Sequence, residues 1–145
     1  MDINELSPSE VFSYFQKICA IPHGSGNTGM IADYCLEFAK LHGLKARKDT
    51  SDNVVIFKAG SSGYEDREPV ILQGHLDMVC EKEPDSDIDM SVQSIKACTD
   101  GKMVWADGTT LGADDGIAVA YALAVLADDS LEHPRLEAVI TVDEE

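Results

Sequence analysis

Positive charge and long apolar runs are the two features that this 145-residue chain has least of. Only 11 side chains are Lys or Arg, against 27 that are Asp or Glu, so the formal net charge is −16. This balance argues against nucleic acid and anionic membranes as partners, because their phosphate groups repel an acidic surface. No apolar run approaches the roughly 20 residues that a bilayer-spanning helix needs. The carboxylate excess has two interpretations: it keeps the protein in solution, or part of it holds cations.

Paired cysteine motifs and an export signal are also missing. The four cysteines, Cys19, Cys35, Cys80 and Cys98, show no Cys-x-x-Cys spacing, and the first two fall on apolar helix stripes. We therefore expect reduced, buried thiols. The first five residues lack the basic start and apolar stretch of a signal peptide. Together these absences predict a cytoplasmic protein.

Helical and strand-like patterns alternate along the chain, whose length suits one domain with a core. Apolar residues recur at helical spacing before Pro22, again from Ile31 to Leu41, and almost all round from Ile117 to Leu126. Strand patterns cover 45–49, 54–57, 70–72 and 136–142, and a hairpin is expected at 95–105. This alternation predicts an α/β fold with helix/sheet/helix layers and a mixed, mostly parallel sheet.

The strand at 70–72 leads directly into a histidine and a carboxylate. The residues after it are Gly74, His75, Leu76 and Asp77. Histidine is a common metal ligand, and a nearby carboxylate can fix its tautomer and raise its basicity. A His-x-Asp sequence after a strand is more often structural or incidental. A metal centre therefore requires further residues from elsewhere in the chain.

Two acidic pairs occupy comparable positions. Asp114 and Asp115 lie in a glycine-bounded turn before the apolar helix, and Glu144 and Glu145 follow the last strand. Taken alone, the first pair could cap the helix and compensate its dipole, and the second could be a solvated acidic end. In open α/β sheets, however, sites gather outside the carboxyl ends of strands. The joint occurrence favours the two-metal site of a hydrolase.

The residue types suggest a role for each member of this site. One metal would be held by His75 and one oxygen of Asp114, and the other by the second oxygen of Asp114 and by Glu145. Glu144 would stay off the metals as the base for a metal-bridging water, and Asp77 would hydrogen-bond the far nitrogen of His75. Such ligands suit zinc, although manganese or cobalt could occupy the same site.

Three segments resemble a known enzyme family. The sequences GHLDMVCEK at 74–82 and GTTLGADDGI at 108–117 are similar to those of the aminoacyl-histidine dipeptidases. These are Xaa-His (carnosine-type) dipeptidases of the di-zinc aminopeptidase/aminoacylase superfamily. The sequence IPHGSGN at 21–27 also resembles their N-terminal loop. The resemblance implies the roles given above and adds Asp115, which would follow Asp114 through a cis peptide bond. Two zinc ions would serve the intact enzyme.

The resemblance also implies an activity and a place in a larger protein. The implied reaction is metal-dependent hydrolysis of dipeptides, preferentially of the β-alanyl-histidine type. Alternatives are another superfamily amidohydrolase, such as a tripeptidase or N-acyl-amino-acid deacylase, and a non-catalytic fragment that acts as an interaction module. Because family members are longer, residues 1–145 would be the N-terminal part of a di-zinc exopeptidase catalytic domain. The rest of that domain and a lid or dimerisation domain would be absent, and the intact enzyme would be a homodimer.

A shortened catalytic domain has a consequence for the metals. The family's further carboxylate ligand and late histidine ligand are not in this sequence, so each zinc would have two protein ligands. A catalytic zinc usually has three. We therefore expect the isolated chain to bind zinc weakly and to hydrolyse nothing.

Overall fold

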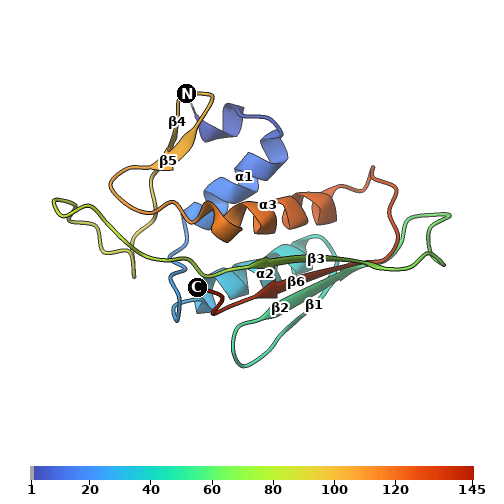
Figure 1. The fold of residues 1–145 in the computed structure, drawn as a ribbon. Helices are drawn as coiled ribbons and strands as arrows, with labels where there is room; N and C mark the ends of the chain where they lie inside the picture. Colours follow the sequence, from blue (N-terminus) through green and yellow to red (C-terminus); the bar gives the residue numbers. More distant parts are fainter. Residues whose placement is uncertain (1) are drawn as a thin grey trace.

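A computed structural model describes residues 2–145 (Figure 1). The elements are η1 (Ile3–Glu5), α1 (Ser9–Cys19), α2 (Gly29–Leu41), β1 (Lys45–Lys48), β2 (Val54–Lys58), β3 (Val70–His75), β4 (Ala97–Thr99), β5 (Val104–Ala106), α3 (Ala113–Ala127) and β6 (Leu136–Thr141). Each predicted helix and strand is present, and β4 and β5 form the predicted hairpin. Across the described residues, every helix is too short or too polar to cross a membrane.

The main sheet has four strands in the order β1-β2-β6-β3. Only β3 and β6 run parallel, while β1 pairs antiparallel with β2 and β2 pairs antiparallel with β6. The sheet is therefore mixed, as predicted, but the expectation of a mostly parallel sheet is wrong. The connection between β1 and β2 explains part of the difference, because residues 49–53 are too few for the crossover that a parallel pair requires. The parallel pair is joined through α3.

Burial alternates along the two central strands of this sheet. The residues of the inner face are fully buried: Val54, Ile56, Ala138 and Ile140. The residues between them are only partly buried, and they form the outer face together with Ile71 of β3, which is 60% exposed. This period of two indicates that one face of the sheet is covered and the other is open.

The three α-helices lie on the covered inner face. Lys48, which is paired with Val54 in the sheet, forms an ion pair with Asp33 of α2. Helix α3 packs on the inner face at Gly74, and α1 packs on α3 (Figure 1). The expected second helical layer is therefore not found within residues 2–145. An apolar stripe shows that a helix is buried on one side, but it does not specify the sheet face on which the helix packs.

Helix α3 connects this core to the candidate site. It is apolar nearly all round, as the sequence predicts, and it lies between α1 and the sheet (Figure 1). Its first turn approaches α1 closely, since a Cβ atom on Gly116 would lie 3.2 Å from Cε2 of Phe15. The core thus fixes the start of α3 beside the end of β3, where the predicted site residues lie.

Candidate metal centre

Three segments that are distant in sequence meet at one end of the sheet. Strand β3 ends at His75, which is paired with Thr141 near the end of the parallel strand β6. Residues 143–145 therefore emerge beside the histidine, and the first turn of α3 brings Asp114 to the same place. The structure thus brings together the histidine and the carboxylates predicted from sequence, because parallel strands end at the same sheet edge.

The His75 ring is nearly buried and has a distinct partner at each nitrogen. Nδ1 lies 3.0 Å from the main-chain carbonyl oxygen of Asp77, so this nitrogen donates when it carries the proton. Nε2 lies 3.1 Å from Oδ1 of Asp114 and 3.7 Å from Oε2 of Glu144. In this tautomer the lone pair of Nε2 faces the carboxylates, which is the arrangement that a metal-binding imidazole needs.

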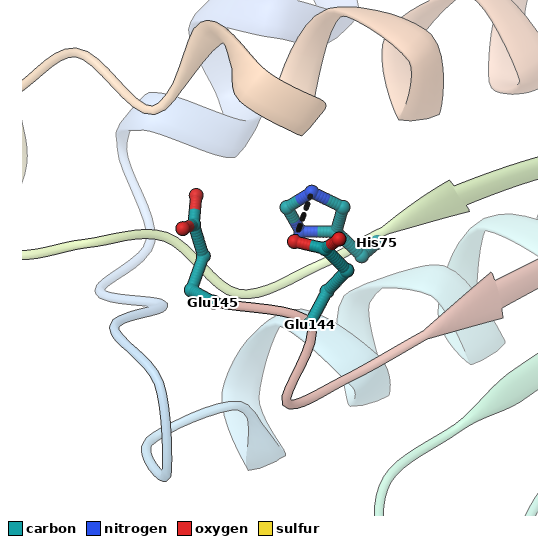
Figure 2. Close-up of side chains that lie close together, drawn as sticks. All are labelled: His75, Glu144 and Glu145. Atoms are coloured by element: carbon teal, nitrogen blue, oxygen red, sulfur yellow. Dashed lines mark ion pairs between the residues drawn. The ribbon is translucent and has the colours of Figure 1, made fainter.

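The glutamate pair completes a cluster with this histidine. One ligand atom from each of His75, Glu144 and Glu145 lies within 4.8 Å of the other two (Figure 2). Asp114 is outside this group of three but contacts the imidazole from the first turn of α3. One imidazole nitrogen and several carboxylate oxygens form a donor set that fits zinc. Glu144 is predicted to act as the base without binding a metal. It lies in the same cluster as the predicted ligands His75 and Glu145.

The electrostatic surroundings of His75 favour its protonated form. Burial alone would lower its pKa, but hydrogen bonds to the Asp77 carbonyl and the Asp114 carboxylate, together with the negative charges of Asp77 and Asp115, outweigh burial. The pKa of His75 is therefore above its usual value of 6.5. A proton and a metal ion compete for the same nitrogen, so this environment attracts cations of either kind.

Asp77 is fully buried, and its carboxylate lies close to both the His75 ring and the main chain of the glutamate pair. Its Oδ1 lies 3.5 Å from Nδ1 of His75, farther than the carbonyl oxygen of the same residue. Its carboxylate also accepts the main-chain N–H of Glu144 at 3.2 Å and of Glu145 at 3.3 Å, and the Ser25 hydroxyl at 3.0 Å. Burial would raise the pKa of Asp77, but these donors more than offset it, so the pKa lies below the usual value.

The two adjacent aspartates point to different partners. The peptide bond between Asp114 and Asp115 is cis, as the family resemblance implies. The Asp114 side chain is 86% exposed and contacts the His75 ring, whereas Oδ2 of Asp115 accepts the main-chain N–H of His75 at 3.3 Å. Asp114 is therefore available to a metal, while Asp115 connects the first turn of α3 to the end of β3 through a hydrogen bond.

Two residues of the loop after α1 were not predicted as part of the site. Ser25 donates to Asp77, and His23 is buried, with Nδ1 2.6 Å from the carbonyl oxygen of Ile21. Burial lowers the pKa of His23, although the Ile21 carbonyl and Asp77 act in the opposite direction. The sequence signal for both residues is the family-like segment IPHGSGN at 21–27, since a serine between two glycines is otherwise an ordinary loop composition.

Comparisons with known proteins agree with this fold. A curated protein, the cytosol non-specific dipeptidase of Escherichia coli (strain K12), is 44% identical over 144 residues, 99% of this chain and 30% of that protein. The crystal structure of an aminoacylhistidine dipeptidase from Vibrio alginolyticus matches with a TM-score of 0.96 at 42% identity. This chain is homologous to these dipeptidases. The structural match covers 100% of this chain and 30% of that one, so the chain spans about 30% of the length of both relatives.

A more distant likeness shows the fold alone. The crystal structure of a tripeptidase from Staphylococcus aureus matches with a TM-score of 0.75 at 23% identity, over 96% of this chain and 37% of the tripeptidase. No protein-family model matches the chain. The similarity to dipeptidases is therefore carried by two relatives above 40% identity.

Proposed function

We propose that this chain is part of a metal-dependent dipeptidase and supplies its general base together with part of a two-metal site. The cluster of His75, Glu144 and Glu145, with Asp114 on the same imidazole, carries the proposal. The homology to two dipeptidases supports it. We propose zinc as the metal, dipeptides of the Xaa-His type as substrates, and the cytoplasm as the compartment, since one relative is named a cytosol dipeptidase.

Each residue has a role in this proposal. His75 and Asp114 would hold one zinc, and Asp114 and Glu145 would hold the other. Bound zinc supplies Lewis acidity, which makes a water acidic near neutral pH and polarises a scissile carbonyl. Glu144 takes the proton of the attacking water and delivers it to the leaving amine. Its carboxylate is suited to this transfer because it is 61% exposed and lies beside the imidazole.

We further propose that residues 1–145 form the N-terminal part of the catalytic domain of a homodimeric enzyme. The described residues provide two ligands for each zinc, one fewer than catalytic zinc sites usually have. The isolated chain accordingly binds zinc weakly and hydrolyses no dipeptide. Calorimetry with zinc and a peptidase assay on the chain test this expectation, which tight binding or measurable turnover would contradict.

The general base is tested in a full-length protein that contains this chain. Glu144→Ala should abolish hydrolysis of β-alanyl-histidine while the zinc content stays unchanged, whereas His75→Ala should lower the zinc content itself. Gln73→Ala is a matched control, because Gln73 is an exposed residue of the same strand. Near-normal turnover by Glu144→Ala would refute the assignment of the base.

Substrate class is tested with the same protein. The fold is shared with a tripeptidase, so a related amidohydrolase is the second candidate. Rates with β-alanyl-histidine, a tripeptide and an N-acyl amino acid should be highest for the dipeptide. A higher kcat/KM for either of the other two substrates would replace the dipeptidase proposal with that activity.

A further inference from the structure

The buried carboxylate of Asp77 connects three separate segments. It accepts the hydroxyl of Ser25 from the loop after α1, and the main-chain N–H groups of Glu144 and Glu145 from the residues after β6. Asp77 itself follows β3 and its main-chain carbonyl faces the ring of His75. The position of the glutamate pair relative to the histidine therefore depends on the orientation of one carboxylate.

The loop that carries Ser25 is held beside Asp77 by its main chain. The N–H of Ser25 donates to the carbonyl of Met78 at 3.2 Å, and the N–H of Met78 donates to the carbonyl of His23 at 3.2 Å. Gly24 lies between these bonds, where a Cβ atom would stand only 2.6 Å from Sγ of Cys80. The loop approaches this closely because Gly24 has no side chain, and the approach delivers the Ser25 hydroxyl to the carboxylate.

We propose that Ser25 is a positioning residue of the metal centre, an inference that rests on the proposed function. Its hydroxyl holds Oδ2 of Asp77 where that oxygen also accepts the N–H of Glu145. Ser25 thereby sets the position of the Glu145 carboxylate relative to His75, although its own side chain touches no proposed ligand atom. The role requires only a hydroxyl group at this place.

The hydrogen bonds of Asp77 predict what removal of this hydroxyl does. Without it, Oδ2 keeps one donor, the N–H of Glu145, and Oδ1 keeps the N–H of Glu144. The buried carboxylate remains paired, so the fold persists, but its orientation is less restricted. Loss of a hydrogen bond that orients metal ligands typically weakens metal affinity about 10- to 100-fold.

The test compares variants of the 145-residue chain. Zinc affinity is measured by calorimetry, the thermal midpoint is measured without zinc, and the amide resonance of Glu145 is recorded by NMR. Ser25→Ala removes the hydroxyl and Ser25→Thr retains it. Ser91→Ala is the matched control, since within residues 2–145 the hydroxyl of Ser91 bonds only to Asp89, in an exposed turn.

We expect Ser25→Ala to weaken zinc binding about 10-fold and to shift the Glu145 amide resonance, with little change in the midpoint. Ser25→Thr should restore both, and Ser91→Ala should change neither. Unchanged affinity and an unchanged resonance in Ser25→Ala would overturn the proposal, as would failure of Ser25→Thr to restore them. His75→Ala distinguishes failure of the Ser25 proposal from failure of the proposed metal site. If His75→Ala binds zinc as tightly as the parent chain does, the proposed metal site itself is wrong.

Discussion

The main-chain N–H of His75 donates to the carboxylate of Asp115 across 3.3 Å, and this bond joins the end of β3 to the first turn of α3. The bond requires space beside Gly74, because a Cβ atom there would lie 3.0 Å from Oδ2 of Asp115 and 3.4 Å from Cβ of Ala118. Glycine before the histidine therefore allows the helix start to approach the strand, and with it the exposed carboxylate of Asp114.

Gly74→Ala tests this close approach. The added methyl group should displace Asp115 and lower the free energy of unfolding by about 1–3 kcal/mol, as other insertions into packed regions do. Urea denaturation measures the effect, with Gln73→Ala as the control at an exposed position of the same strand. Equal stability of Gly74→Ala and the parent chain would show that the contact is easily relieved.

His23 should make stability depend on pH. Burial lowers its pKa below 6.5, so the unfolded chain takes up a proton at this residue before the folded chain does. The free energy of unfolding should therefore fall as pH decreases through 6.5, and it should level off below the folded pKa. His23→Asn removes this contribution, so the stability difference between the parent chain and the variant should shrink from pH 7 to pH 5 in urea titrations. Parallel pH profiles would contradict the prediction.

The four cysteines should divide into two classes by reactivity. Burial raises the pKa of Cys19 and of Cys35 to about 12, and both thiols are buried in the core, as the sequence predicts. Cys80 is exposed and Cys98 is partly exposed. A disulfide reagent should therefore modify two thiols in the folded chain and all four in urea. Fast modification of all four without denaturant would show that the core opens readily.

Lys58 should stabilise the end of α3. Its buried ammonium donates to the carbonyl oxygen of Asp128 at 2.9 Å, where a cation is favourable next to the final carbonyl groups of a helix. Lys58→Met keeps the apolar stem and should lower the free energy of unfolding by about 1–2 kcal/mol. Lys40→Met, which removes an exposed pair with Glu37, should cost less than about 0.5 kcal/mol. Equal losses would contradict a specific role for Lys58.

The sequence predicts the elements of this fold well, because their signals are local. Helical spacing and short apolar runs locate α1, α2, α3 and the strands β2, β3 and β6, and Asp100-Gly101 marks the hairpin turn, whereas β1 has the largely basic sequence KARK. Strand direction and helix placement are not local properties. The alternation of helices and strands therefore led to a mostly parallel sheet with two helical layers, whereas β2 is antiparallel to both neighbours and α2 shares a face with α3.

The candidate site shows the same division. Which residues gather could be predicted, because His75 and the glutamate pair each follow a strand that points to one sheet edge. Which atoms they contact could not be predicted. The Asp77 carboxylate was expected at the imidazole and lies 3.5 Å from it, but it also accepts main-chain N–H groups 67 and 68 residues away. The residue types in a sequence do not show which main-chain N–H groups a side chain will accept. The metal, the ligand roles and the base stay predictions.

The open outer face of the sheet should promote association between copies of the chain. It presents Ile71 together with the partly buried Val55, Phe57 and Val139, next to the lysine- and arginine-bearing edge strand β1. At low salt the net charge of −16 keeps copies apart, but at 0.15 M salt such repulsion extends only about 8 Å. Colloidal stability of the isolated chain should therefore decrease with ionic strength, as the exposed apolar surface becomes the dominant attraction between molecules.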